Sequence, residues 1–273
     1  MDPRLTPANS RIAHESLRGQ IDAPAYTQGK WRRVAAGVVD ILKAPNGPRN
    51  RQTLWGERVL ELENHDGFAF VQAEKDGYVG YIASACLMDD AQATHWVSSL
   101  GTHLYPAPDM KQHEVDTLSF GARLTIVGAV NRFLETDTGQ FVPTSHLSPV
   151  GARCEDTVAN AELFLGTPYL WGGNSRAGID CSGLVQAALL AVGHDCPGDS
   201  DMQEGLGSAI ADDTPLERGD LLFWKGHVAL VVDQARMIHA NAFHMAVAYE
   251  EIDAGIARIE TQGDGPVTAR RRL

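Results

Sequence analysis

An abrupt change of composition at Asp180-Cys181 constrains the fold of this 273-residue chain more than any other feature. Between Gly166 and that point the sequence is rich in glycine and aromatic residues, which favours a strand end and tight turns. Residues 181–192 are rich in Ala, Leu and Val and contain no proline, which predicts a helix. Asp180 is a favoured N-cap residue, and Gly193 is a favoured residue at a helix C-terminus. We therefore expect a helix that begins at Cys181.

The place of Cys181 in this helix bears on its reactivity. Unpaired backbone amides and the helix dipole stabilise a thiolate at the first turn, and they lower a thiol pKa from its free value of about 8.5. Such a thiol is a candidate nucleophile. It needs a base that accepts its proton and a third group that orients the base. The alternative is an inert buried thiol, which is the usual fate of a single cysteine.

Two histidines further along the chain meet this requirement. Residues 221–224, 227–232 and 237–243 have the composition of successive β-strands. His227 begins the second of these segments, and His239 lies in the third. For either histidine taken alone, a place in the core or on the surface is the alternative interpretation.

The spacing of His227 and His239 decides whether their side chains meet. In an antiparallel hairpin, two residues that lie opposite each other point to the same face of the sheet. His227 and His239 therefore share a face only when the numbers of opposite residues add up to an even value, which demands a loop of odd length. If residue 232 lies opposite 236, His227 faces Asn241 and His239 lies on the diagonal, about 7–8 Å away by backbone. One imidazole is then able to orient the other.

Three segments, in chain order, resemble the NlpC/P60 family of papain-like bacterial cell-wall cysteine peptidases: Asp180-Cys181-Ser182-Gly183, Gly226-His227-Val228 and His239-Ala240. The family's cysteine, histidine and third polar residue correspond to Cys181, His227 and His239. The family also has an oxyanion-site tyrosine twelve residues before the cysteine, where this chain has Tyr169. The resemblance covers roughly residues 154–260. It implies an α+β fold in which the helix that carries the cysteine packs on an antiparallel sheet.

The resemblance also implies residues that bind substrate. In relatives with SH3-like domains, the positions of Asp180 and Ser182 bind the free amino group of the substrate, and Ser200 and Tyr78 are further candidates for substrate contacts. Helix capping is the alternative role of Ser182. Ser200 is also a candidate N-cap of a following helix. Trp171 is expected to be a core aromatic residue.

The implied reaction is hydrolysis of the bond between γ-D-glutamate and a diamino acid, diaminopimelate, in murein peptides. Short peptides with a free N-terminus are the expected substrates, in cell-wall recycling. No metal or organic cofactor is expected. Two alternatives remain, a papain-fold acyltransferase or amidase that acts on a non-murein substrate, and a catalytically inactive binding module. The presence of Cys181, His227, His239 and Tyr169 weighs against the second.

Short β-runs separated by turn dipeptides fill the chain from Tyr26 onward. The expected strands are 34–42, 58–63, 68–73 and 78–82, and a weaker copy of the pattern follows 60 to 65 residues later. The two copies resemble tandem bacterial SH3-like barrels, of which the second is divergent. The resemblance to the family's intracellular-type members implies that the first barrel helps to close the active-site cleft, and spacer or wall-targeting roles are alternatives. We expect an N-terminal arm over residues 1–25, barrels over 26–90 and 91–150, and a papain-like peptidase domain over 151–273.

Composition and charge restrict the partners and the compartment. A hydrophobic content of 44% suits packed cores, and a net charge of −12 argues against nucleic acid or an anionic membrane as a partner. The N-terminus lacks a basic segment followed by an apolar run, so a cytoplasmic location is expected. Four irregularly spaced cysteines suit reduced thiols, and no zinc-binding pattern is present. The oligomeric state is left open.

Overall fold

The structure, a computed structural model, describes residues 1–273 and divides into two compact units, Met1–Gly151 and Ala152–Leu273. Each unit is described by itself. No helix in either unit combines the length and the apolar character that crossing a bilayer requires.

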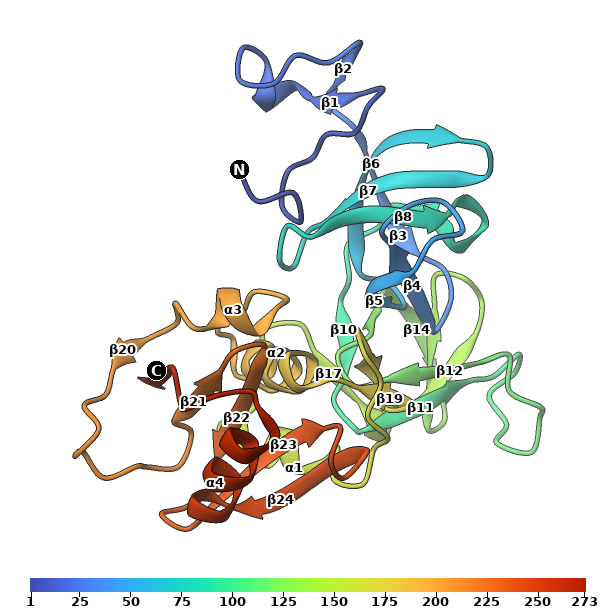
Figure 1. Ribbon diagram of the computed structural model, residues 1–273. Helices are drawn as coiled ribbons and strands as arrows, with labels where there is room; N and C mark the ends of the chain where they lie inside the picture. The colour runs from blue at the N-terminus through green and yellow to red at the C-terminus, as the bar shows by residue number, and fades with distance from the viewer. The chain divides into compact units, whose positions relative to one another are not determined.

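The first part of the N-terminal unit is one seven-stranded antiparallel sheet (Figure 1). Its strand order is β5-β4-β8-β7-β6-β3-β9. Alternate side chains of these strands, mostly Val, Ile and Ala, form a buried core. The bounds are β3 Lys30–Val34, β4 Val38–Leu42, β5 Arg49–Leu54, β6 Arg58–His65, β7 Phe68–Ala73, β8 Val79–Ala83 and β9 Leu87–Asp89, with a 3-10 turn η2 at Ser84–Cys86.

Local chemistry explains how this sheet agrees with and differs from the expected strands. The turn between β6 and β7 holds Asp66 at φ 52° and Gly67 at φ 81°, a left-handed pair that Asp-Gly favours in tight hairpins. The single strand expected over 34–42 was wrong, because β3 ends at Val34 and β4 begins at Val38. Strand β5 was missed, since its polar sequence Arg-Asn-Arg-Gln-Thr-Leu lacks an apolar alternation.

The N-terminal arm packs on this sheet through polar contacts. Arg11 donates two hydrogen bonds of 2.7 Å to the carboxylate of Glu63 on β6, and the Val79 amide of β8 donates to the Arg4 carbonyl at 2.8 Å. Within the arm, β1 (Ala13–His14) and β2 (Tyr26–Thr27) pair in parallel around the 3-10 turn η1 (Glu15–Leu17).

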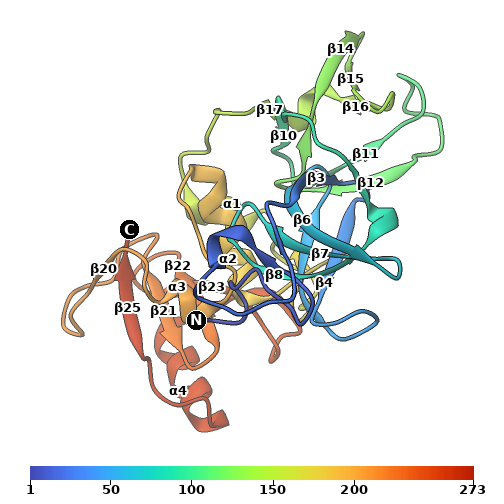
Figure 2. The same cartoon turned by 90° about the horizontal axis from the view of Figure 1, so that it is seen from above.

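Residues 92–150 form three small sheets, with orders β13-β10-β17, β11-β12 and β14-β15-β16. The last is an antiparallel meander, seen at the upper right of Figure 2. The expectation that this segment is a second SH3-like barrel stays a prediction. The bounds are β10 His95–Val97, β11 Gly101–Leu104, β12 Asp116–Ser119, β13 Arg123–Leu124, β14 Ile126–Val130, β15 Phe133–Thr136, β16 Phe141–Pro143, η3 Thr144–His146 and β17 Leu147–Pro149.

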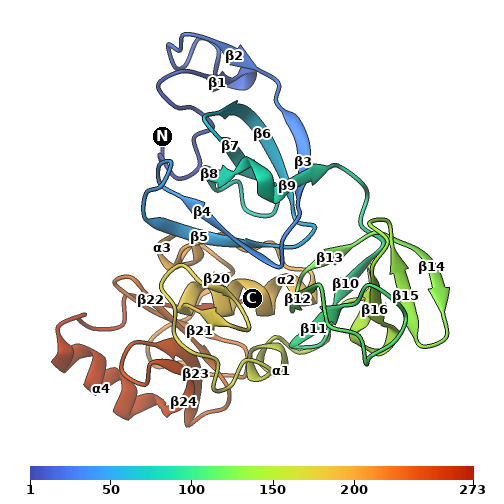
Figure 3. The ribbon, with the colours of Figure 1, turned by 90° about the vertical axis from the view of Figure 1, so that its right-hand side faces the viewer.

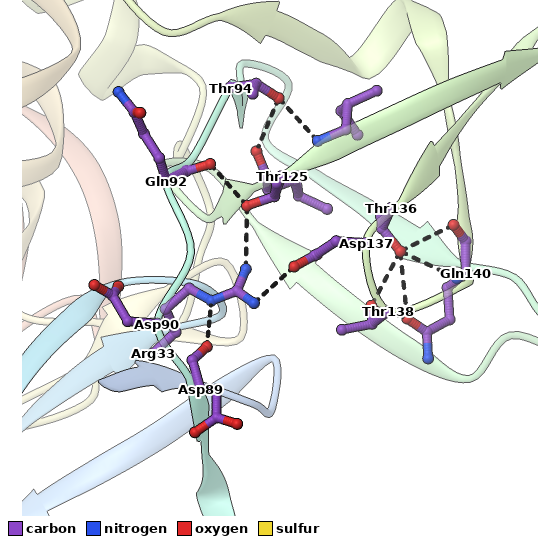
Figure 4. A network of polar contacts seen from close by, with 12 residues as sticks. Arg33, Asp89, Asp90, Gln92, Thr94, Thr125, Thr136, Asp137, Thr138 and Gln140 are labelled. Carbon is purple, nitrogen blue, oxygen red and sulfur yellow. Dashed lines mark hydrogen bonds and ion pairs between the residues drawn. The ribbon is translucent and has the colours of Figure 1, made fainter. Parts of the chain in front are cut away.

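A buried arginine links these sheets to the first one (Figure 4). Arg33 of β3 donates to the Asp89 carbonyl at 2.9 Å, to Thr125 Oγ1 at 3.1 Å and to Asp137 Oδ2 at 2.7 Å. The Arg33 side chain is 7% exposed and that of Asp137 is 23% exposed, so the guanidinium is largely shielded from bulk water. The two parts of the N-terminal unit are therefore joined by a charge-assisted network as well as by an apolar core.

The C-terminal unit is built on a six-stranded sheet of order β20-β25-β21-β22-β23-β24 (Figure 3). Its strands are antiparallel, and helix α2 packs against α1, β22 and β23. Helix α4 contributes Ile252 and Ile259 to an apolar cluster with β21, β22 and β23. The bounds are α1 Thr157–Glu162, β18 Asn174–Ser175, β19 Gly178–Ile179, α2 Cys181–Val192, α3 Ser200–Gln203, β20 Ser208–Ala209, β21 Leu221–Trp224, β22 His227–Val231, β23 Arg236–Asn241, β24 Ala246–Glu251, α4 Ile252–Gln262 and β25 Ala269–Arg272.

Candidate active site

Helix α2 begins at Cys181, and Asp180 caps it. The Asp180 carboxylate accepts from the Gly183 amide at 2.6 Å, from the Ser182 hydroxyl at 3.1 Å and from the Gly172 amide at 2.9 Å. The helix ends before Gly193, whose φ of 86° is the left-handed conformation that favours glycine. Cys181 is 7% exposed and is not part of a disulfide. The thiol therefore lies at the positive end of a capped helix, which is where a thiolate is stabilised.

The two histidines lie on adjacent strands in the register expected from the sequence. Leu230 pairs with Ile238 and Val231 with Met237, so paired residue numbers sum to an even value. Nε2 of His227 lies 2.8 Å from Nδ1 of His239. The prediction that one imidazole orients the other is consistent with this hydrogen bond.

A carboxylate and a guanidinium extend the histidine pair. Nε2 of His239 lies 2.9 Å from Oε2 of Glu250 on β24. Arg258 of α4 donates to both Glu250 oxygens at 2.7 Å. Burial alone raises the pKa of Glu250, but hydrogen bonds from Arg258 and His239 outweigh it and hold that pKa well below its usual range. The four side chains form one continuous hydrogen-bonded chain.

Burial keeps both imidazoles neutral. It lowers the pKa of His227 to about 3, with the nearby His239 adding to the effect. It also lowers the pKa of His239, against the opposing effect of the hydrogen bond to Glu250. A neutral imidazole retains an unprotonated nitrogen, so His227 is available as a base at neutral pH.

Tyr169 lies beside the start of α2. It forms an isolated parallel bridge with Ile179, and its amide donates to the Met245 carbonyl at 2.9 Å. Burial raises the pKa of Tyr169, and the charges of Cys181 and Asp180 raise it further. The phenol therefore keeps its proton at neutral pH and is available as a hydrogen-bond donor.

The structure gathers the expected catalytic side chains into one unit. Cys181 begins the helix that packs against the strands of His227 and His239, and it lies close enough to Tyr169 to contribute to the raised pKa of that phenol. The catalytic roles themselves stay predictions.

The expected substrate-binding residues fall into two groups. Asp180 and Ser182 are buried and bonded to each other at the helix start, which supports the capping role of Ser182. Ser200 is buried as the first residue of α3, and the expectation that it caps α3 was wrong, since Asp199 occupies the N-cap position. Tyr78 belongs to the N-terminal unit, where it is buried. Substrate contacts at these four residues stay predictions.

One expected core residue is exposed. Trp171 is 71% exposed, so the core assignment was wrong. Residues 166–169 pair with the backbone of residues 245–247. Trp171 lies just after this paired segment, in a turn that leaves its indole outside the core. A glycine-flanked aromatic residue has no periodic pattern from which its direction can be predicted.

One group of side chains has the composition of a metal site. Ligand atoms of His239, His244 and Glu250 all lie within 4.8 Å of one another. Arg258 occupies both Glu250 oxygens, however, and its positive charge opposes a cation at the same place. His244 Nδ1 lies 3.0 Å from Asn241 Oδ1. The hydrogen-bonded chain explains the cluster better than a metal does.

Comparison with known proteins identifies the family. The sequence model of the NlpC/P60 family matches residues 166–263, and that of the bacterial dipeptidyl-peptidase Sh3 domain matches residues 41–87. A γ-D-glutamyl-L-lysine dipeptidyl-peptidase of Bacillus subtilis (strain 168) is 31% identical over 215 residues, which are 69% of this chain and 71% of that protein. The chain belongs to the NlpC/P60 family. It is a cysteine peptidase, and the resemblance found in the sequence is confirmed.

A second relative shows how much of the two chains is similar in sequence, and a solved structure shows the fold. A γ-D-glutamyl-L-lysine dipeptidyl-peptidase of Bacillus cereus is 33% identical over 133 residues, covering 46% of this chain and 39% of that protein. The crystal structure of an NlpC/P60 family protein from Bacillus cereus ATCC 10987 has a TM-score of 0.75 and 19% identity, covering 89% of this chain and 99% of that one. This likeness shows the fold, an α+β NlpC/P60 domain together with an SH3-like domain.

Proposed function

We propose that this peptidase hydrolyses the bond between γ-D-glutamate and a diamino acid in peptidoglycan peptides, with Cys181 as the nucleophile and His227 as the base. The observation that carries the proposal is the His227–His239 hydrogen bond on strands packed against the helix that Cys181 begins. The substrate class is supported by the names of the relatives, which are γ-D-glutamyl-L-lysine dipeptidyl-peptidases. In this chain the diamino acid is diaminopimelate.

The first half of the reaction forms an acyl-enzyme. His227 takes the thiol proton, and Cys181 Sγ bonds to the amide carbonyl carbon, which places a negative charge on the carbonyl oxygen. The Cys181 backbone amide and the Tyr169 hydroxyl donate to that oxygen. The carbon–nitrogen bond then breaks, and the imidazolium of His227 gives its proton to the leaving amine. The products are a thioester on Cys181 and the diamino acid with a free amino group.

The second half releases the acid. A water molecule gives a proton to His227 and bonds to the thioester carbon, and the carbon–sulfur bond breaks as Sγ regains a proton. His239 holds the ring of His227 and stabilises its charged form, as the aspartate does in a serine triad. All proton transfers pass through residues of the C-terminal unit.

A free N-terminus on the substrate fits the chemistry of Asp180. Its carboxylate accepts three hydrogen bonds within the protein, and a carboxylate has about four acceptor positions. One position is therefore left for a substrate ammonium group. Short peptides with this group arise when peptidoglycan is degraded, so we propose a role in cell-wall recycling, which places the enzyme in the cytoplasm.

Digestion of two peptides tests the proposal. L-Ala-γ-D-Glu-diaminopimelate and its N-acetylated form are incubated with the enzyme, and the products are identified by mass spectrometry. The proposal requires release of diaminopimelate from the free peptide and a much slower reaction of the acetylated one. Equal cleavage of both would refute the N-terminal preference. No cleavage of either, or an acyl-transfer product in the presence of an added amine, would refute the proposed reaction.

A further inference from the structure

We propose that Glu250 and Arg258 are positioning residues that fix which ring nitrogen of His227 accepts the thiol proton. Neither residue belongs to the three short motifs that carry the resemblance, and both act through His239 rather than on the substrate. The expected effect on kcat rests on the proposed function. The expected tautomer of His227 concerns the enzyme without substrate and does not depend on that function.

The sheet register places the three side chains on a diagonal line across three strands. His239 pairs with Ala248, and Met237 pairs with Glu250, so Glu250 lies one diagonal step from His239 on the same face. His227 lies one diagonal step from His239 on the other side, by the register of β22 and β23. The resulting atom pairs are His227 Nε2 to His239 Nδ1 at 2.8 Å and His239 Nε2 to Glu250 Oε2 at 2.9 Å.

The chemistry of Glu250 sets the direction of every proton in this line. An ionised carboxylate only accepts hydrogen bonds, so Nε2 of His239 must carry a proton and donate it. A neutral imidazole has one donor and one acceptor nitrogen, so Nδ1 of His239 accepts. His227 must then donate from Nε2. Its proton-free nitrogen is therefore Nδ1, and this is the atom that takes the proton of Cys181.

Arg258 keeps Glu250 in the state that this direction needs. A protonated Glu250 would itself donate, and it would allow the opposite tautomer in both rings. The two 2.7 Å bonds from Arg258 oppose protonation and fix the plane of the carboxylate. The side chains of Glu250 and Arg258 are 11% and 17% exposed, so water competes little with these bonds.

Close packing of α4 on the sheet makes this contact possible. A Cβ atom at position 255 of α4 would lie 2.2 Å from Met237 Cε and 3.2 Å from Glu250 Cδ. A side chain at this position would require the ends of Met237 and Glu250 to shift, so glycine suits the observed packing of the helix on the sheet. Gly255 and Arg258 lie one helical turn apart, so the same close approach carries the guanidinium to Glu250.

If Glu250 and Arg258 fix the tautomer of His227, their removal should change that tautomer. If they form only a structural ion pair, the tautomer should stay the same. The ¹⁵N chemical shifts of the histidine rings distinguish protonated from unprotonated nitrogens, and His227→Gln identifies the signals of His227. In the substrate-free full-length enzyme, His227 is expected to be protonated at Nε2 alone. Glu250→Ala and Arg258→Met should give a mixture of tautomers. Glu250→Gln keeps an acceptor oxygen for His239 and should retain more of the original tautomer than Glu250→Ala.

Kinetics supply the second readout. Glu250→Ala should lower kcat on L-Ala-γ-D-Glu-diaminopimelate by about 10–100-fold and leave KM within about twofold, because a positioning group acts on the chemical step. The matched control is Glu251→Ala, which removes the same charge from the next residue, an exposed N-cap of α4 without a side-chain cap bond. Circular dichroism verifies that each variant is folded.

Two results would overturn the inference. One is an unchanged His227 tautomer in both Glu250→Ala and Arg258→Met, and the other is an equal loss of kcat in Glu250→Ala and Glu251→Ala. The failure of the proposed function looks different. In that case the wild-type enzyme does not release diaminopimelate, while the tautomer of His227 still changes in the variants.

Discussion

Nε2 of His227 lies 2.8 Å from Nδ1 of His239, and the two rings belong to adjacent antiparallel strands one diagonal step apart. His239 is 1% exposed, so water does not replace it as a partner of His227. The orientation of the base thus depends on a side chain that never meets the solvent.

His239→Ala should leave a folded enzyme with partial activity. The base remains, but its ring is free to rotate and its charged form loses a partner, so we expect kcat/KM to fall by about 10–100-fold. Removal of the base itself in His227→Ala should cost more. His244→Ala is the control, since His244 is an exposed residue near the same hairpin. Equal activity of His239→Ala and His244→Ala would contradict the orienting role.

The buried state of His227 predicts how stability depends on pH. Burial lowers its pKa to about 3, whereas a histidine in the unfolded chain has a pKa of about 6.5. Between these values the unfolded state binds a proton that the folded state does not, so the free energy of unfolding falls as pH decreases through this window and is retained above it. The slope for one such group is at most about 1.4 kcal/mol per pH unit. Urea unfolding of wild type and His227→Gln from about pH 7 to pH 4 measures how the free energy of unfolding changes with pH. The variant should show the shallower slope, and identical slopes would show that His227 is not buried in its neutral form.

Tyr169→Phe should lower kcat by about 100-fold and leave KM nearly unchanged, because the hydroxyl is needed only when the carbonyl oxygen becomes charged. Burial and the charges of Cys181 and Asp180 raise the pKa of Tyr169, so loss of the phenol proton should not limit activity at moderately alkaline pH. Steady-state kinetics on the free peptide test both points. An unaffected kcat in the variant would remove Tyr169 from the oxyanion site.

Arg33→Met should destabilise the N-terminal unit by about 3 kcal/mol, since it leaves the partly buried Asp137 carboxylate without its cation (Figure 4). Arg18→Met is the control, because Arg18 and Glu15 form an exposed pair of the kind that contributes little to stability. Urea unfolding of the full chain compares the two variants. Similar unfolding curves would mean that the Arg33 network contributes no more than a surface ion pair.

Local chemistry made much of the C-terminal unit predictable from the sequence. Asp180 and Gly193 have side-chain and backbone preferences that define helix ends, and the structure places both at the ends of α2. The register of the histidine strands meets the parity condition stated from the sequence, since only an even sum places both rings on one face. These inferences needed no knowledge of distant contacts.

Features that depend on tertiary packing were not predictable. Glu250 and Arg258 lie on β24 and α4, outside the three short motifs around Cys181, His227 and His239, and their roles become visible only when the strands and the helix are assembled. In the hairpin of β23 and β24 the paired residue numbers have an odd sum, which places Glu250 on the face of His239, but the sequence alone does not determine that register. Trp171 was wrongly assigned to the core because composition alone does not show which way a turn residue points.

Turnover of L-Ala-γ-D-Glu-diaminopimelate by Cys181→Ala, with the products measured by mass spectrometry, tests directly whether Cys181 is the nucleophile. Alanine is well tolerated at the first turn of a helix, so the variant should keep the fold of α2. Cys154→Ala, which removes another thiol of the same unit, is the control. We expect that Cys181→Ala releases no diaminopimelate while Cys154→Ala retains wild-type activity. Wild-type turnover by Cys181→Ala would exclude Cys181 as the nucleophile.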